Sequence, residues 1–227
     1  MTVVFLHAFP LDPRMWDGQR ALAPGSEAPL LYGLGETMDD WARAILDRHP
    51  GELVLVGASM GGYVAYHAAR LEPDRIRGLL TVGARAQADA PAGRTRRDEL
   101  ARSAREQGPR AVWEAMRETL FSQNAAAGAV EQARAWTLEQ DAEELARALE
   151  VMRDRRDTTD LLGLLDPQPL AVLGELDPVA RPGDFSGVLV EERVVVVRET
   201  GHLPMLERPD RFDPILEEFL ESHAESD

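Results

Sequence analysis

The sequence predicts an α/β protein with a doubly wound, mostly parallel sheet of about six strands and a helical insertion. Three observations predict this fold class. Apolar runs of strand length recur along the chain, with segments of helix length between them. Most of these runs are continuous rather than alternating, which is typical of strands that helices cover on both faces. Residues 86–165 interrupt the alternation because they contain no convincing strand pattern.

Outside residues 86–165, the expected strands and helices alternate regularly. The strands are expected at Thr2–Leu6, Pro29–Tyr32, Leu53–Gly57, Ile76–Val82, Pro169–Leu173 and Arg193–Val197. The helices are expected at Asp39–Arg48, Met60–Leu71 and Arg211–Ser222. Apolar residues recur at helical spacing in the last helix, which predicts one buried stripe. Pro214 is expected in the first turn of that helix, where a missing N–H is tolerated.

The chain divides into a core, residues 1–85 and 166–227, and a helical segment, residues 86–165, which we call the lid. The pattern in the lid predicts three or four helices, three of them at Pro109–Gln123, Ala129–Gln140 and Asp141–Arg155. Ala90–Gly93 is expected to be a hinge at its entrance. Ligands of doubly wound sheets bind at the carboxyl edge of the strands, so we expect the lid to lie over that edge.

The composition describes a globular protein and argues against several classes of function. Hydrophobic residues make up 44% of the 227 positions, and charged residues make up 29%. A net charge of −15 argues against a nucleic-acid partner and against docking on an anionic membrane. The lack of cysteine excludes disulfides and thiolate chemistry. No apolar stretch has the length of a membrane span, and the N-terminus lacks a signal pattern, so a cytoplasmic location is expected.

One serine stands where a nucleophile is expected on such a sheet. Gly57–Gly61, with the sequence GASMG, follows the apolar run Leu53–Val56 and leads into the helix pattern Met60–Leu71. A tight strand-turn-helix connection exposes the side chain of Ser59 at the carboxyl edge of the sheet, beside a helix N-terminus. The neighbouring glycines leave no Cβ to collide with the adjacent strand or helix. Ser59 is therefore the predicted nucleophile.

A serine hydroxyl needs a base, and His202 is the best placed of five histidines. His202 follows Gly201 in the loop after the last expected strand, which ends at the same sheet edge as Ser59. His49 and His223 are expected to be exposed at helix ends. His67 falls inside the helix after Ser59 and is expected to be packed or solvated there rather than catalytic.

The imidazole in turn needs a carboxylate to orient it. Asp177 and Glu175 both stand in the turn after the expected strand Pro169–Leu173. Asp177 is the preferred acid, and Glu175 is its competitor. The chain order Ser59, Asp177, His202 is the order expected for a nucleophile on this kind of sheet.

Attack on a carbonyl also requires donors for the oxyanion. We expect these to be the backbone N–H of Met60, directly after the serine, and that of Phe9 in the loop after the first strand. His7 is expected to hold that loop by hydrogen bonding rather than to titrate in the reaction. The sequence contains no metal-ligand spacing and no phosphate-binding glycine pattern after a strand, so it implies neither metal nor cofactor.

Four segments together resemble the α/β-hydrolase superfamily, in particular its branch of small serine esterases, enol-lactonases and cofactor-free haloperoxidases. They are His7–Asp12 with Met15–Trp16, Gly57–Gly62, Gly174–Asp177 and Gly201–Pro204. The segment Met152–Asp157 is similar to one that these enzymes often carry before the strand bearing the acid. The resemblance covers nearly the whole chain outside the lid. It implies the hydrolase fold and a Ser–His–Asp triad.

Two features depart from that family pattern. Family members usually have one or two strands before the strand that carries the first motif, whereas that strand begins here at Thr2. Pro29–Tyr32 is therefore expected near an exposed sheet edge, which must be short, covered or paired in a homodimer. Ala8 replaces a common glycine, which suggests ordinary backbone dihedrals at that position.

The function predicted from these residues is hydrolysis of a small carboxylic ester or lactone through an acyl-enzyme on Ser59. The same site could instead cleave a carbon–carbon bond or act as a lyase, and a ligand-binding sensor with this fold is the alternative from another class. Lid residues that could line an apolar pocket are Trp113, Met116, Phe121, Trp136 and Met152, although core packing explains each of them as well. The arginines Arg94, Arg96, Arg97 and Arg102 could attract an acidic substrate or simply form a solvated helix face.

Overall fold

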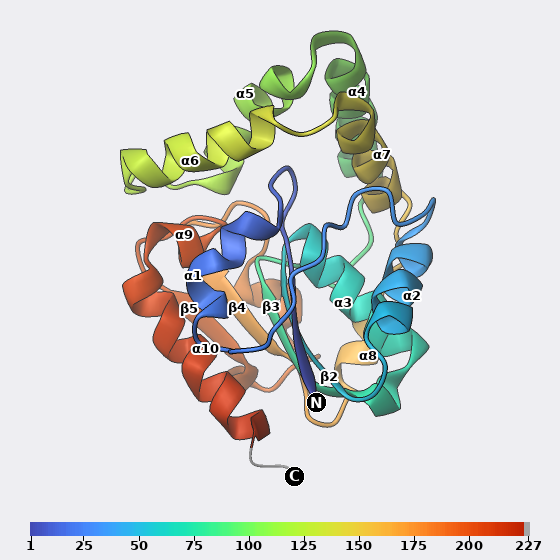
Figure 1. The fold of residues 1–227 in the computed structure, drawn as a ribbon, viewed down its shortest axis with the longest axis vertical. Helices are drawn as coiled ribbons and strands as arrows, with labels where there is room; N and C mark the ends of the chain where they lie inside the picture. The colour runs from blue at the N-terminus through green and yellow to red at the C-terminus, as the bar shows by residue number, and fades with distance from the viewer. Residues whose placement is uncertain (225–227) are drawn as a thin grey trace.

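A five-stranded parallel sheet forms the centre of the computed structural model, which describes residues 1–224 (Figure 1). The strands lie in the order in which they occur in the sequence, and each pairs in parallel with the next. They are β1 (Thr2–Leu6), β2 (Leu53–Ala58), β3 (Ile76–Val82), β4 (Leu170–Gly174) and β5 (Val194–Val197). The predicted fold class is confirmed, and five of the expected strands are correct to within one residue at each end.

The sixth expected strand, Pro29–Tyr32, is wrong because this segment is a loop. Proline brings no N–H to a ladder, and the Leu31 N–H donates to a histidine ring instead of to a strand. The outer edge of β1 is instead covered by a residue just before this segment, Glu27. Glu27 forms a single parallel bridge opposite Val4: its carbonyl oxygen accepts from the Phe5 N–H at 2.8 Å, and its N–H donates to the Val3 carbonyl oxygen at 3.0 Å.

Two layers of helices cover the sheet (Figure 1). On one face lie α2 (Met38–Arg48), α3 (Met60–Leu71) and α8 (Thr159–Leu162). On the other face lie α1 (Asp17–Arg20), α9 (Pro204–Glu207) and α10 (Pro209–Ala224). Short 3-10 turns occur at Pro13–Trp16, Pro73–Arg75, Pro182–Phe185 and Glu191–Arg193.

The strands supply both cores because successive side chains point to opposite faces. Leu53 and Leu55 of β2 belong to the core beneath α2 and α3, whereas Val54 and Val56 belong to the core beneath α10. All four side chains are fully buried. This explains why the strands appear in the sequence as continuous apolar runs.

The last helix, α10, begins two residues earlier than expected. Pro209 therefore takes the tolerated position in its first turn, and Pro214 lies inside the helix, which corrects the prediction for Pro214. The predicted apolar stripe is confirmed, since Phe212, Leu216 and Phe219 are buried against the sheet.

Two histidine predictions are corrected and one is confirmed. His49 and His223 were expected to be exposed, but both are buried: His49 lies 3.6 Å from Glu27, and His223 packs against the ring of Phe219. Gly78 of β3 leaves room for the His223 ring, which a Cβ would approach to 2.7 Å. His67 is buried inside α3, and its Nδ1 lies 2.6 Å from Asp39.

The lid contains five helices and no strand within residues 86–165, and four of these helices, all except α8, lie over the carboxyl ends of the strands (Figure 1). The five helices are α4 (Pro91–Gln107), α5 (Pro109–Leu120), α6 (Ala127–Leu138), α7 (Ala142–Arg153) and α8. The segment Ala90–Gly93, expected to be a hinge, contains the first turn of α4, which begins at Pro91. Proline at the first position of a helix is compatible with the helix, so this segment starts α4 instead of interrupting the chain.

Among residues 1–224, no helix combines the length and the apolar character needed to cross a bilayer.

Candidate active site

Ser59 lies in a strained turn between β2 and α3. Its backbone has φ 49° and ψ −110°, a conformation that residues other than glycine rarely adopt. The Ser59 N–H donates to the carbonyl oxygen of Val82 at the end of β3, at 2.7 Å. Ser59 therefore sits at the carboxyl edge of the sheet, between two neighbouring strands and directly before a helix.

The glycines around Ser59 are there because the backbone passes too close for a side chain. A Cβ on Gly57 would lie 2.5 Å from the Gly61 carbonyl oxygen, and one on Gly61 would lie 2.1 Å from the Leu6 carbonyl oxygen. A Cβ on Gly62 would lie 2.3 Å from that of Ala84. The sequence pattern around the serine thus encodes the close packing of α3 on β1 and β3.

His202 and Asp177 form a buried hydrogen-bonded pair. The Nδ1 of His202 lies 3.0 Å from both carboxylate oxygens of Asp177, and the two side chains are 2% and 0% exposed. Because a carboxylate only accepts hydrogen bonds, Nδ1 carries the proton and Nε2 is left as an acceptor. This is the tautomer that a general base requires.

The competing acid, Glu175, points elsewhere. Its Oε2 accepts a hydrogen bond from the Glu199 N–H at 2.9 Å, on the exposed side of the loop. Asp177 is fixed from the other direction, since its Oδ1 also accepts from the Val179 N–H at 2.7 Å. Of the two acids that the sequence left open, only Asp177 contacts His202.

Gly83 lies between the serine turn and the Asp177–His202 pair. The sequence analysis did not identify it. It follows Val82, the residue bonded to Ser59, and has φ +61°. A Cβ on Gly83 would lie 2.7 Å from Nδ1 of His202 and 3.1 Å from Asp177. Ser59, Asp177 and His202 therefore gather at the end of β3. A glycine directly after a predicted strand was the available signal.

The two expected oxyanion donors lie in different segments: Phe9 is in the loop after β1, and Met60 is the first residue of α3. Among residues 1–224, the N–H groups of Phe9 and Met60 donate no hydrogen bond, whereas the Ala8 N–H contacts Sδ of Met15 at 3.1 Å. The φ of Ala8 is not positive, which agrees with the expectation of ordinary dihedrals. The Ser59 hydroxyl likewise has no hydrogen-bond partner within the described chain.

His7 is a fully buried ring that holds this loop, as expected. Its Nδ1 lies 3.1 Å from the Ala8 carbonyl oxygen, and its Nε2 accepts from the Leu31 N–H at 3.0 Å. These contacts assign the proton to Nδ1, because Nε2 accepts only when it is unprotonated. Burial lowers the pKa of His7 to about 4, although the Ala8 carbonyl and Asp12 act in the opposite direction.

This lowered pKa predicts a loss of stability in mild acid. Between pH 6.5 and pH 4 the unfolded chain binds a proton at His7 that the folded chain rejects, so stability falls as the pH falls. We expect His7 to account for about 2 kcal/mol of lost unfolding free energy between pH 7 and pH 5. Urea unfolding of wild type and His7→Gln at both pH values measures this contribution. An equal loss in the two proteins would contradict it.

A second buried carboxylate, Glu207, was also missed. Its Oε1 accepts from the N–H of Gly201 at 2.8 Å and of Ser122 at 3.2 Å, and its Oε2 accepts from the Ser122 hydroxyl at 2.5 Å. Gly201 precedes His202, and Ser122 lies between α5 and α6. Glu207 therefore ties the histidine loop to the lid. An acid five residues after the histidine was the only sequence signal.

The five lid residues expected to line a pocket have different surroundings. Trp113 and Met152 are buried in the two cores, and Trp136 packs beneath the guanidinium of Arg14. Phe121 borders a cavity of about 310 Å³ beside the Asp177 and His202 loops. Met116 borders a larger cavity of about 510 Å³, which is lined mainly by the lid helices α4, α5 and α7.

Within residues 1–224, no group of three or more histidine and carboxylate side chains is arranged to hold a metal ion.

Comparison with protein families gives one match across most of the chain. A model described as "Alpha/beta hydrolase family" matches residues 3–214. Two curated proteins named pimeloyl-[acyl-carrier protein] methyl ester esterase match shorter segments. The protein from Aromatoleum aromaticum is 31% identical over 90 residues, and the one from Shewanella woodyi is 39% identical over 62 residues. These segments cover 36% and 27% of this chain but only 36% and 22% of the relatives.

Solved structures share the fold over nearly the whole chain. A thermophilic esterase from Thermogutta terrifontis, solved with malate bound, has a TM-score of 0.88 and 32% identity, covering 98% of this chain and 90% of that one. The enol-lactonase from Burkholderia xenovorans has a TM-score of 0.79 and 20% identity, covering 97% and 91%. At 20% identity, the similarity to the enol-lactonase shows a shared fold and nothing about activity.

Proposed function

This chain belongs to the alpha/beta hydrolase family, and on that premise we propose that it is a serine hydrolase that cleaves a small carboxylic ester or lactone. One observation carries the proposal. The buried pair of Asp177 and His202 lies against Gly83, next to the strained turn that presents Ser59. The similarity to an esterase at 32% identity supports an ester as the substrate.

The first half of the reaction forms an acyl-enzyme. Oγ of Ser59 attacks the carbonyl carbon of the ester while its proton passes to Nε2 of His202. The carbonyl oxygen becomes an oxyanion, which the free N–H groups of Phe9 and Met60 stabilise. The intermediate then expels the alcohol, which takes the proton from Nε2. In a lactone, the leaving hydroxyl remains attached to the acyl group.

The second half returns the enzyme to its starting state. Water attacks the acyl carbon and gives a proton to Nε2 of His202. The new intermediate then releases the carboxylic acid, and Ser59 regains its proton from His202. Asp177 stays ionised throughout and stabilises the charged imidazole. The serine hydroxyl must turn towards Nε2 when substrate binds, since catalytic hydrogen bonds are often loose before that step.

Labelling with a fluorophosphonate tests the nucleophile directly. The reagent reacts with an activated serine, so we expect one covalent adduct, located by peptide mass mapping on the peptide that contains Ser59. Denatured protein is the control and should not be labelled. The hydrolysis rates of a panel of short-chain esters and lactones then test the substrate class. Labelling at another serine, or none, would contradict the assignment.

A further inference from the structure

The cavity of about 510 Å³ lies where the connection from β3 into the lid meets α4, α5 and α7. Its lining has two kinds of side chain. Leu100, Met116 and Leu149 provide an apolar wall, and Arg85, Arg96 and Arg97 provide positive charge. A cavity of this composition suits a molecule with an apolar chain and an anionic end.

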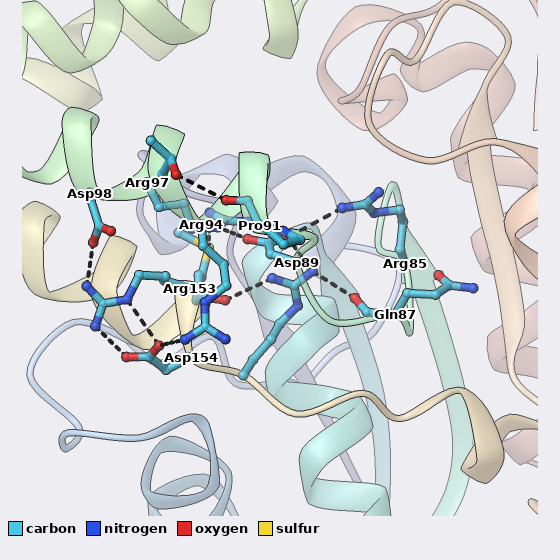
Figure 2. Close-up of polar contacts among 12 residues, drawn as sticks. Arg85, Gln87, Asp89, Pro91, Arg94, Arg97, Asp98, Arg153 and Asp154 are labelled. Carbon is cyan, nitrogen blue, oxygen red and sulfur yellow. Dashed lines mark hydrogen bonds and ion pairs between the residues drawn. The ribbon is translucent and has the colours of Figure 1, made fainter.

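Asp89 organises the arginines at one side of this cavity (Figure 2). Its side chain is 3% exposed and forms ion pairs with Arg97 and, at 2.8 Å, with Arg155. Although burial opposes ionisation, these two arginines hold the pKa of Asp89 below its ordinary value. Arg85 is a weaker partner at 3.4 Å. The charge of Asp89 is thus already compensated by Arg97 and Arg155.

Two of the lining arginines are incompletely paired. Nε of Arg85 is buried and has no hydrogen-bond partner within the described chain. Arg96 forms no ion pair among residues 1–224, unlike its neighbours Arg94 and Arg97. Three arginines and two acids, Asp89 and Glu99, line the cavity, and Asp89 is also paired with Arg155 from outside the lining. In a chain with a net charge of −15, this is a local excess of positive charge.

The cluster lies close to the nucleophile turn. The Arg155 guanidinium stacks over the ring of Tyr63 at 4.1 Å, and the Tyr63 N–H donates to the Ser59 carbonyl oxygen at 3.1 Å. Ala84, next to Arg85, packs against Gly62 in the same turn of α3. The Asp89 cluster therefore reaches, through Arg155, the ring of Tyr63, a residue that lies one turn of α3 after Ser59.

We propose that Arg85 and Arg96 bind a carboxylate that the ester substrate carries at a distance from its scissile bond. The apolar wall then contacts the chain between the two groups. This inference rests on the proposed function of Ser59 and adds a substrate class to it: esters with a remote carboxylate. Guanidinium groups suit this role because their planar donors match carboxylate geometry.

Two pairs of substrates, each matched in length, test the inference. On the acyl side, mono-p-nitrophenyl adipate is compared with p-nitrophenyl hexanoate. On the alcohol side, 3-butyryloxypropanoate is compared with propyl butyrate. In at least one pair, we expect wild type to prefer the carboxylate member by about 10-fold or more in kcat/KM, through a lower KM. The preferred pair identifies which side of the ester carries the charge.

Arg85→Gln and Arg96→Gln should each reduce that preference about 10-fold, by raising KM for the carboxylate ester. Arg102→Gln is the matched control, because Arg102 lies exposed on α4 but does not line the cavity. It should keep the wild-type ratio. The inference is overturned if wild type has equal kcat/KM for the two esters of both pairs. It is also overturned if Arg85→Gln and Arg96→Gln leave the ratio of kcat/KM within the preferred pair unchanged.

Binding without turnover separates this inference from the proposed function. Calorimetric titration of adipate into Ser59→Ala protein should show binding that the added Arg96→Gln substitution weakens about 10-fold. Binding of adipate in a protein that hydrolyses none of the four esters would count against the proposed reaction while keeping the carboxylate site. Hydrolysis of the neutral esters without adipate binding would overturn the carboxylate site alone.

Discussion

Replacing Ser59 with alanine should lower the turnover of p-nitrophenyl butyrate by about 10⁴-fold to 10⁶-fold. The substitution removes the oxygen that forms the acyl-enzyme, so only the free N–H groups and substrate binding remain to accelerate the reaction. The fold should be unaffected, because the Ser59 hydroxyl has no partner among residues 1–224 and alanine has the same strain at φ 49°. The measurement is kcat from initial rates.

A matched control removes the hydroxyl of another serine. Ser186 is exposed in the loop before β5, so Ser186→Ala should retain the wild-type rate. Circular dichroism of both variants checks that the fold is intact. Equal turnover by Ser59→Ala and wild type would rule out the acyl-enzyme mechanism.

Asp177→Asn should lower kcat by about 10⁴-fold while leaving the fold intact. The Val179 N–H, at 2.7 Å from Oδ1, requires an oxygen at that position, so the amide nitrogen of asparagine takes the place of Oδ2. Its N–H then points at Nδ1 of His202, 3.0 Å from the present Oδ2. The ring must move its proton to Nε2, where it can no longer accept the serine proton.

Glu175→Gln provides the comparison for this effect. Glu175 contacts the Glu199 N–H and lies in the same turn as Asp177 without reaching the histidine. We therefore expect its kcat to stay within about threefold of wild type, since surface substitutions away from a site have small effects. If Glu175→Gln were the damaging change and Asp177→Asn harmless, the assignment of the acid would be wrong.

The sequence alone determined the parts of the molecule that local patterns encode. Continuous apolar runs identified five of the strands, because a strand covered on both faces must be apolar at every position. The GASMG segment predicted the turn at Ser59, since only glycine permits the close contacts of that turn with β1 and α3. The order of serine, acid and histidine predicted the candidate site, whose catalytic roles stay predictions for the substitutions above to test.

Features that depend on distant partners were decided only by the tertiary structure. The sequence could not choose firmly between Asp177 and Glu175, because the choice depends on which side of a turn faces a histidine 25 residues away. His49 and His223 occupy exposed positions in the helix pattern but are buried by other segments of the chain.

The same reason explains the Pro29–Tyr32 loop and the arginine-lined cavity. Leu31 donates to the ring of His7, 24 residues earlier, and this contact replaces a strand that the local apolar run had favoured. Arg85 and Arg97 reach the same Asp89 from a loop and a helix, and Arg155 joins them from beyond α7. Local patterns report propensity and periodicity, whereas burial and charge pairing depend on neighbours that only the folded chain brings together.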